Sequence, residues 1–316
     1  MTTASRHEPV MLHEAVEGLA VRAGGRYVDA TVGLGGHAAA ILEAAAPGGC
    51  LLGIDADPDA LAGAAQRLGP FGDAVVLVQG NFRNIAALCA ERDFTAVDGV
   101  LFDLGVSSLQ LELPGRGFSF QRDEPLDMRM DPAGDLTAAE IVNEYDEQEL
   151  AELIRDFGEE RRARRIARAI VERRPITTTG ELVNAVEQAV GRGPKRQIHP
   201  ATLTFQALRI AVNQELDSLV EALPAAHGLL AGVGARLVVI AFHSLEDRIV
   251  KEYFRRESTD CICPPRTPMC VCGHRATLRL VNRRVLRPAD AEVARNPRAR
   301  SARMRVAEST VEREAA

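Results

Sequence analysis

A glycine-rich turn within residues 27–42 contains the first residues whose types and spacing could do chemistry. The segment YVDATVGLGGHAAAIL runs from a short apolar stretch ending in Asp29, through Gly33, Gly35 and Gly36, into a run of small residues. Glycine adopts backbone conformations that other residues avoid, and it lets the main chain approach a ligand closely. Such a turn between a strand and a helix is typical of a nucleotide-like cofactor site.

The glycines alone do not identify the cofactor. After Gly36 the chain continues with His37 and Ala38, so alanine stands where the dinucleotide fingerprint G-x-G-x-x-G has its third glycine. Dinucleotide-binding proteins tolerate that replacement. The glycine turn by itself is therefore compatible with either NAD or S-adenosylmethionine (SAM) as the cofactor.

Three acids favour a cationic cofactor, because Asp29, Asp55 and Asp103 each close a short apolar run. Asp55 is placed to accept hydrogen bonds from ribose hydroxyls in NAD and SAM enzymes alike. Asp29 distinguishes SAM enzymes from NAD enzymes. The sulfonium and ammonium groups of SAM tolerate a nearby carboxylate, whereas the pyrophosphate of NAD does not. We therefore expect SAM. Helix N-cap roles for Asp55 and Asp103 are compatible with this expectation.

A second group of candidate residues lies near the C-terminus. Four of the six cysteines fall within twelve residues, in the segment CICPPRTPMCVC. We expect no export signal, which favours a metal site over a disulfide framework. Four thiolates suit tetrahedral zinc; the alternative is four reduced thiols, or a redox-labile pair, in a surface loop. The expected zinc ligands are Cys261, Cys263, Cys270 and Cys272.

Two arginine-rich stretches contrast with the net charge of −6. Residues 161–174 contain seven arginines and residues 279–305 contain nine. Such stripes let an acidic protein bind a polyanion locally, although a solvated helix face is an equal alternative. In the first stretch the apolar residues share one helix face. The arginines left exposed for a partner such as RNA are Arg161, Arg164, Arg165 and Arg168.

The elements that must position these residues alternate between strand and helix over the first 105 residues. Short apolar runs are separated by segments with apolar residues three and four apart. This α/β pattern predicts a mostly parallel sheet covered on both faces. A loop rich in glycine, proline and charge follows. Continuous helical patterns then cover 147–174 and 202–230, and ARLVVIAFHS returns to a buried strand.

The simplest organisation is one α/β domain interrupted by an all-helical insertion. We expect residues 1–130 to form the first part of the core, 131–200 the substrate-recognising insertion, and 201–316 the second part. That second part contains a Cys-rich loop at 261–274 and a frayed tail at 307–316. No apolar run approaches the ~20 residues of a membrane span, and we see no signal-peptide core. We therefore expect a cytoplasmic protein with no membrane partner.

Nine segments spread over about residues 7–307 resemble the RsmH (MraW) family. They are VDATVGLGGH, GIDADP, QGNF, DLGVSS, RGFSFQRDEPLDMRMD, GEERRARRIARAI, HPATLTFQALRI, AFHSLEDRIVK and NPRARSARMRV. The resemblance implies a class I SAM-dependent methyltransferase fold, Rossmann-like, with a helical insertion. It also implies methylation of N4 of a decoding-centre cytidine (cytidine 1402 in rRNA numbering) of 16S rRNA in the small ribosomal subunit. The cofactor contacts that it implies are Gly35, Gly36, His37, Asp55, Phe82, Asp103 and Gln110, beside Gly33 of the turn.

Methylation of an exocyclic amino group depends on positioning, because the nitrogen lone pair is delocalised into the ring. Amino-methyltransferases commonly use a side chain and a backbone carbonyl as acceptors for the two N–H bonds, next to prolines and an aromatic residue. This chain has DLGVSS at that place. We expect Asp103 and the Leu104 carbonyl to be the acceptors. The candidates for an aromatic residue that stacks on the base are Phe118, Phe120 and Phe242.

His243 is the second catalytic candidate, because it follows the strand of AFHS and should lie at the same rim as Asp103. It would shuttle a proton or contact phosphate. The equal alternative is a histidine satisfied by Glu246 or Asp247 nearby.

Other functions remain to be separated by experiment. A C5-cytosine methyltransferase needs a cysteine nucleophile, and none lies near DLGVSS. An amino-methyltransferase of another nucleic acid, or a non-catalytic SAM-binding ribosome-assembly factor, shares the same cofactor motifs. The sequence leaves open whether free rRNA or the assembled subunit is the substrate, and whether the protein is a monomer or a homodimer.

Overall fold

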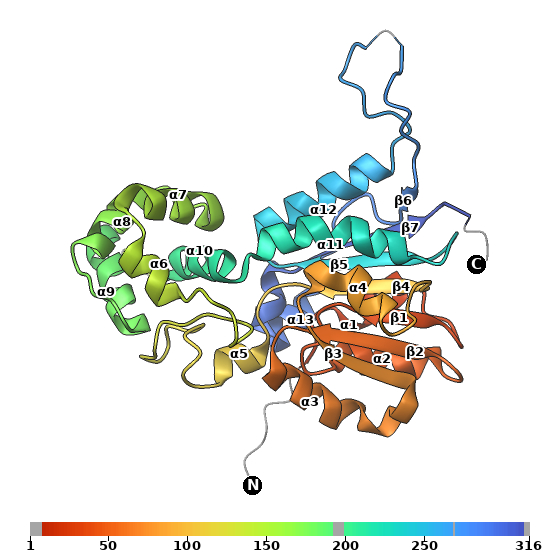
Figure 1. Ribbon diagram of the computed structural model, residues 1–316, viewed down its shortest axis with the longest axis horizontal. Helices are drawn as coiled ribbons and strands as arrows, with labels where there is room; N and C mark the ends of the chain where they lie inside the picture. The colour runs from red at the N-terminus through yellow and green to blue at the C-terminus, as the bar shows by residue number, and fades with distance from the viewer. Residues whose placement is uncertain (1–7, 192–198, 268, 313–316) are drawn as a thin grey trace. The chain divides into compact units, whose positions relative to one another are not determined.

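The computed structural model describes residues 8–191, 199–267 and 269–312. The chain divides into two compact units. Unit 1 comprises Met1–Gly105 and Leu216–Ala316, and unit 2 comprises Val106–Glu215 (Figure 1). No helix among the described residues has both the length and the apolar character needed to cross a membrane.

The described part of unit 1 is built on a seven-stranded sheet in the order β3-β2-β1-β4-β5-β7-β6. The first five strands are parallel, while β7 runs antiparallel to both β5 and β6. This mostly parallel sheet confirms the expected class I methyltransferase fold. The strands are β1 (Arg26–Asp29), β2 (Cys50–Asp55), β3 (Val75–Gln79), β4 (Gly99–Asp103), β5 (Arg236–Ala241), β6 (Leu278–Leu280) and β7 (Arg303–Ser309).

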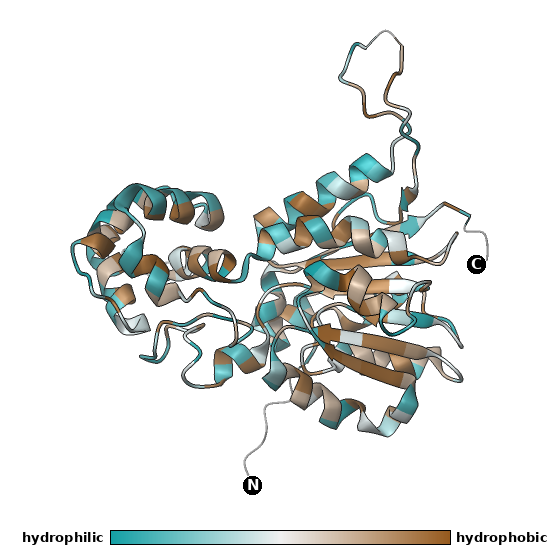
Figure 2. Ribbon diagram, in the orientation of Figure 1, coloured by the Kyte–Doolittle hydropathy of each residue, from teal (hydrophilic) through white to brown (hydrophobic). Residues whose placement is uncertain are grey.

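Helices cover both faces of this sheet, because alternate strand residues point to opposite sides. Val100 and Phe102 of β4 are buried in one apolar cluster, and Leu101 is buried in another. The parallel strands β2, β3, β4 and β5 are accordingly mostly hydrophobic (Figure 2). The first cluster contains residues of α4 (Ile85–Ala90), α11 (Glu215–Leu229) and α12 (Ser244–Glu257); the second contains residues of α1 (Leu12–Leu19), α2 (Gly36–Ala45) and α3 (Pro58–Leu68).

Unit 1 has one further α-helix, α13 (Asp290–Arg295), close to the last strand in sequence. Its buried Glu292 accepts a hydrogen bond from the backbone N–H of Met11 at 2.7 Å. Short 3₁₀ turns at Gly69–Ala74, Phe82–Asn84 and Pro297–Ser301 complete the described elements of this unit.

Unit 2 is helical, as the absence of strand patterns between residues 106 and 215 predicts. Its α6, α7 and α9 begin with capping boxes, in which Thr137, Asp146 and Thr178 each cap a helix whose third residue is glutamate. The helices of this unit are α5 (Ser108–Glu112), α6 (Ala138–Glu144), α7 (Glu147–Gly158), α8 (Ala163–Val171), α9 (Thr179–Val190) and α10 (Thr202–Asn213).

Two continuous helices predicted from sequence are each broken in the structure. The segment 147–174 separates into α7 and α8 at Glu159, whose φ is +52°. The segment 202–230 separates into α10 and α11 at Gln214, whose φ is +48°. Position 158, the last residue of α7, requires glycine because a Cβ there would lie 2.5 Å from the Leu203 carbonyl oxygen. α7 therefore packs closely on α10 at the point where the predicted helix is broken.

The unit boundaries differ from the expected insertion at 131–200. The loop before residue 131 belongs to unit 2, because Phe118, Leu126 and Met128 are buried in the helical core of that unit. α10 packs in the same core and extends unit 2 beyond residue 200. The expected frayed tail at 307–316 is wrong for its first residues, since Ala307 and Ser309 are buried in β7. Residues 313–316 lie outside the described chain.

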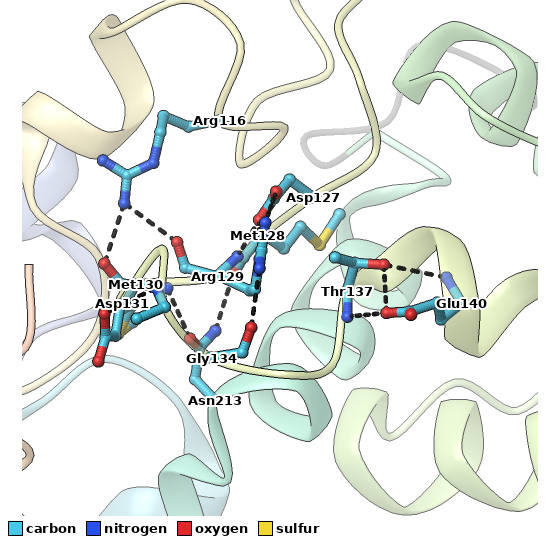
Figure 3. A network of polar contacts seen from close by, with 11 residues as sticks. Arg116, Asp127, Met128, Arg129, Met130, Asp131, Gly134, Thr137, Glu140 and Asn213 are labelled. Carbon is cyan, nitrogen blue, oxygen red and sulfur yellow. Dashed lines mark hydrogen bonds and ion pairs between the residues drawn. The ribbon is translucent and has the colours of Figure 1, made fainter.

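A polar network holds the loop that precedes α6 in place within unit 2 (Figure 3). Arg129 forms a bidentate pair with Asp127 at 2.9 and 2.7 Å, and it donates to the Gly134 carbonyl. Asn213 of α10 accepts from the Met130 N–H at 2.7 Å and donates to the Met128 carbonyl at 2.8 Å. Asp127 and Arg129 of the string LDMRMD therefore stabilise the conformation of the loop.

Candidate functional site

The three acids predicted at strand ends lie on neighbouring strands of unit 1. Asp55, Asp29 and Asp103 end β2, β1 and β4, which are adjacent in the sheet. The strand order reverses between β1 and β4. Open α/β sheets bind ligands beyond the carboxyl ends of their strands at such a reversal. The parallel register therefore brings the predicted acids together at the expected place.

The glycine turn is held against β2 by Asp55. One carboxylate oxygen of Asp55 accepts from the Gly33 N–H at 2.8 Å and the other from the Asp57 N–H at 2.9 Å. Burial raises the pKa of Asp55 to about 6, although these hydrogen bonds act to lower it. Each oxygen keeps a lone pair for a ligand hydroxyl.

Close packing explains why the turn requires glycine. Gly33 and Gly35 have φ values of +52° and +75°, which side-chain-bearing residues rarely adopt. At Gly36 a Cβ would lie 2.3 Å from Pro9 Cγ. Gly35 is also the N-cap of α2, so the backbone reaches the site at a helix N-terminus.

Two buried carboxylate oxygens at this edge lack a partner. Among the described residues, neither Asp29 Oδ2 nor Asp103 Oδ1 has a hydrogen-bond donor within reach. Burial, with a smaller effect from the nearby charge of Asp55, raises the pKa of Asp29 to about 7. The pKa of Asp103 is raised well above 3.8 by burial and then by the charges of Asp29 and Glu246. A cationic ligand would relieve both effects, which fits SAM and disfavours a pyrophosphate.

His37, expected from the resemblance as a cofactor contact, is buried beside Asp103. Its Nδ1 lies 3.5 Å from Asp103 Oδ2, and its Nε2 lies 3.0 Å from the Val10 carbonyl oxygen. A carbonyl can only accept, so Nε2 carries a hydrogen and Nδ1 faces the carboxyl group. Two lone pairs facing each other would repel. We infer that the pair holds one proton, on the imidazole or on the carboxyl.

Thr31 is a residue of this site that the sequence analysis missed. Its Oγ1 accepts from the Asp103 N–H at 2.7 Å, and its own N–H donates to Asp29 Oδ1 at 3.2 Å. It therefore ties the ends of β1 and β4 together. Its position two residues after a strand-ending acid, where side-chain-to-backbone bonds are common, is the only sequence feature that pointed to it.

His243 acts as a helix cap in the structure. Its Nδ1 accepts from the Glu246 N–H at 3.4 Å, and the Glu246 carboxylate accepts from the N–H groups of Phe242 and His243 at 2.8 and 3.2 Å. Of the two acids named as its partners, Glu246 is the one that it contacts. Asp247 instead pairs with Arg305 at 2.7 Å.

The three aromatic candidates lie in different surroundings. Phe242 follows β5, and a Cβ on Gly105 would lie 3.5 Å from its ring, so it borders the loop after Asp103. Phe118 is buried in the helical core of unit 2, and Phe120 stacks on His199 with ring centroids 4.7 Å apart. Within unit 1, Phe242 is therefore the candidate next to Asp103.

Two further cofactor candidates have structural partners. Phe82, at the start of the turn after β3, packs edge-on against Phe102 with ring centroids 5.7 Å apart. Gln110 lies in unit 2, where its carbonyl oxygen accepts from the Ser107 N–H at 3.0 Å and completes the capping box of α5.

The arginines of α8 lie on the solvent side of that helix. Ile166, Ala167 and Ile170 are buried, as the pattern predicts. Arg168 pairs with Glu147 at 3.4 Å, with its own side chain exposed. The exposed arginines of this surface, which we call the α8 arginine face, are Arg161, Arg164, Arg165 and Arg168.

Some arginines of the second stretch, residues 279–305, form ion pairs within unit 1. Arg303 and Arg305 of β7 both pair with Asp247 of α12, at 3.5 and 2.7 Å. Arg279 of β6 pairs with Glu308 of β7. These three arginines therefore join the antiparallel edge of the sheet to its neighbours.

The four cysteines of the C-terminal loop come together, away from the strand ends. Their sulfur atoms all lie within 4.8 Å of one another. The sulfurs of Cys270 and Cys272 lie 3.6 Å apart, and those of Cys272 and Cys261 lie 3.9 Å apart. Cys50 and Cys89 lie elsewhere, in β2 and α4.

Comparison with known proteins identifies the family of this chain. Residues 4–310 match the model of the MraW methylase family. A Dehalococcoides mccartyi protein named ribosomal RNA small subunit methyltransferase H is 58% identical over 97% of this chain and 87% of its own length. Proteins of the same name from Thermomicrobium roseum and Carboxydothermus hydrogenoformans are 55% and 52% identical, over 96% of this chain and 94% and 97% of their own lengths. This chain, with its glycine turn and its acids at the strand ends, belongs to the MraW methylase family.

Proposed function

We propose that this protein transfers a methyl group from SAM to N4 of cytidine 1402 in the decoding centre of 16S rRNA, in the small ribosomal subunit. The observation that carries the proposal is the pair of partnerless buried oxygens on Asp29 and Asp103, beside a glycine turn. The names of the relatives support a ribosomal RNA of the small subunit as the substrate.

The residues of unit 1 suit the separate parts of SAM. The turn at Gly33, Gly35 and Gly36 admits the ligand close to the backbone, and Asp55 retains lone pairs for ribose hydroxyls. Asp29 Oδ2 is the acceptor that we assign to the ammonium group. When bound, SAM supplies an electrophilic methyl group.

The amino group of the base needs two acceptors, and we assign these to Asp103 Oδ1 and the Leu104 carbonyl. Holding both N–H bonds lets the nitrogen pyramidalise, and positioning of this kind can supply about 7–11 kcal/mol in ideal cases. As the N–C bond forms and the C–S bond breaks, the nitrogen must lose one proton. The pair of Asp103 and His37 is the nearest group that can take part in that transfer.

Phe242 is the aromatic residue that we assign to the base, because it borders the loop after Asp103. His243 then serves as a positioning residue, since its cap with Glu246 fixes the chain on either side of Phe242. The α8 arginine face is the proposed contact with rRNA phosphates. A zinc ion on the four cysteines belongs to the proposed holoenzyme and takes no part in methyl transfer.

Nucleoside mass spectrometry tests the proposal directly. Free 16S rRNA and small subunits from cells lacking this modification are incubated with enzyme and SAM. One portion is digested to nucleosides and compared with N4-methylcytidine and C5-methylcytidine standards, and a second is digested to oligonucleotide fragments whose masses locate the methyl group. The expected product is N4-methylcytidine at position 1402. A methyl group at another position or in another nucleic acid would redirect the substrate assignment. SAM binding without methyl transfer to either form would support a non-catalytic assembly factor.

A further inference from the structure

We infer that Cys261, Cys263, Cys270 and Cys272 form a closed tetrahedral zinc site that folds its own loop and is independent of the SAM site. This inference goes beyond methyl transfer, because it assigns a second ligand to a separate part of unit 1. It does not depend on which nucleotide the enzyme modifies.

The distances between the sulfur atoms match a metal site better than a disulfide. Four sulfurs at the Zn–S distance of ~2.3 Å form a tetrahedron whose edges are about 3.8 Å. The Cys270–Cys272 and Cys272–Cys261 pairs lie 3.6 and 3.9 Å apart, and all four sulfur atoms lie within 4.8 Å of one another. A disulfide needs ~2.05 Å between its sulfurs, and all four cysteines are free.

The backbone also holds the two C-x-C segments against each other. The Ile262 N–H donates to Cys272 Sγ at 3.5 Å, and the Val271 N–H donates to Cys263 Sγ at 3.5 Å. The middle residue of each segment therefore donates to a sulfur of the other segment. This reciprocal arrangement keeps the four sulfur atoms together at one point of the loop.

Apolar burial does not account for the order of this loop. The side chains of Ile262 and Val271 are exposed, and Val271 has 82% of its surface accessible. The loop leaves unit 1 between α12 and β6 as a long projection (Figure 1). Its base is fixed by the Thr277 N–H, which donates to the Glu257 carbonyl at 2.8 Å, and by the Ala276 N–H, which donates to the Asp260 carboxylate at 3.2 Å. Beyond that base, the cysteine cluster joins the two sides of the loop.

Four thiolates leave no open coordination position, so the site is structural and not catalytic. Zinc is the metal that we assign, because soft thiolate ligands in tetrahedral geometry suit Zn²⁺, and it needs no redox partner. A small substructure without its own apolar core is a common place for such an ion.

Elemental analysis of protein purified without a chelating tag or added metal tests the assignment. We expect about one zinc ion per chain, and loss of it in each of C261S, C263S, C270S and C272S. The matched control Cys50→Ser should keep the metal, since that cysteine lies in β2. Cobalt substitution should give the intense visible bands of a tetrahedral tetrathiolate site. Less than about 0.2 metal ion per chain with four freely reactive thiols, or stoichiometric iron, would overturn the assignment.

Independence from the SAM site is tested with the C270S/C272S double variant. We expect protease cleavage within 261–274 in this variant and protection in the zinc-loaded protein, because the metal holds the loop closed. SAM affinity should stay within about twofold of the wild type. A large loss of SAM affinity would refute the independence of the two sites. Zinc content needs no activity assay, so its outcome is separate from that of the methylation experiment.

Discussion

Nδ1 of His37, in the first turn of α2, lies 3.5 Å from Oδ2 of Asp103, at the end of β4. The other ring nitrogen of His37 is held by the Val10 carbonyl at 3.0 Å, so the imidazole cannot turn away without losing that bond. The charge of the proposed catalytic acid is therefore linked to a histidine in the glycine turn. Cofactor binding and base recognition share this pair of residues in the proposed mechanism.

Replacing Asp103 with alanine should abolish methyl transfer and leave the fold intact. The side chain supplies an acceptor for the base, and acid–base and acceptor groups of this kind contribute about 10²–10⁴-fold to rate. Single-turnover assays at saturating SAM and saturating rRNA measure the loss. SAM affinity must be measured in parallel, since His37 couples this residue to the turn. Asp73→Ala, at an exposed acid, is the matched control. Full turnover by the Asp103 variant would refute its role.

Replacing Asp55 with alanine should weaken SAM binding by about 1.5–3 kcal/mol, or roughly 10–150-fold in Kd. The variant loses the acceptor of the Gly33 N–H as well as the proposed ribose contact. Titration calorimetry measures the affinity. In thermal unfolding, SAM should raise the melting temperature of the wild type and NAD should not. Unchanged SAM affinity in the variant, or stabilisation by NAD, would contradict the cofactor assignment.

The contribution of Asp29 to the stability of the ligand-free protein should fall as pH rises from about 4 to 7. The pKa of Asp29 is raised from 3.8 to about 7 in the folded state, so the unfolded chain releases this proton first. Over that window the folded state holds more protons, and the free energy of unfolding decreases with pH. The stabilising contribution of the protonated carboxyl is fully present below about pH 4 and lost as pH passes about 7.

Asp29→Asn isolates this contribution, because Asp55 has a raised pKa and shifts stability in the same direction. Urea unfolding from about pH 5 to pH 8 should show the variant gaining stability relative to the wild type as pH rises. SAM should reduce the pH dependence of the wild type, since a cation favours the ionised carboxyl. Parallel curves for the two proteins would show that Asp29 has an ordinary pKa.

Replacing Phe242 with alanine should lower kcat/KM for rRNA by about 5–150-fold, the range for one base-stacking contact of ~1–3 kcal/mol. Phe242→Tyr should retain most activity, because it keeps a ring. SAM affinity should not change in either variant. Phe71→Ala, a partly buried phenylalanine elsewhere in unit 1, is the control for general loosening. Equal losses in both alanine variants would assign Phe242 a packing role.

Replacing Arg161, Arg164 and Arg165 together with glutamine should raise the KM for the rRNA substrate and flatten its dependence on salt. Each lost phosphate contact reduces the slope of log KM against log salt by about 0.7, so three contacts reduce it by about 2. Steady-state assays at several salt concentrations measure both effects.

A triple variant of Arg22, Arg92 and Arg155 carries the same change of charge and serves as the control. These guanidinium groups bond to Asp98, to the Glu91 carbonyl and to Asp156. The control should leave the salt slope nearly unchanged. If both triple variants behave alike, net charge and not the α8 arginine face governs rRNA binding.

The sequence by itself determined the parallel strands, the glycine turn and the gathering of Asp29, Asp55 and Asp103. Short apolar runs predict the strands. Parallel pairing then places the residues that end these strands at one edge of the sheet. The buried face of α8 followed from helical spacing for the same local reason. The sequence also identified the four cysteines as a group of candidate metal ligands, because they are close together in the chain.

Only the tertiary structure decided features that depend on residues far apart in the chain. Glu159 and Gln214 take left-handed backbone conformations that break helical patterns which are locally continuous in the sequence, and beside the first break Gly158 packs against the Leu203 carbonyl of another helix. β7 joins the sheet because its neighbours β5 and β6 offer unpaired edges, and local sequence does not reveal that pairing. The contact between His37 and Asp103 depends on the Val10 carbonyl, which holds the other ring nitrogen from a position 27 residues away in the chain. Burial, set by the whole fold, is what raises the pKa of each acid and leaves two of their oxygens ready for a cation.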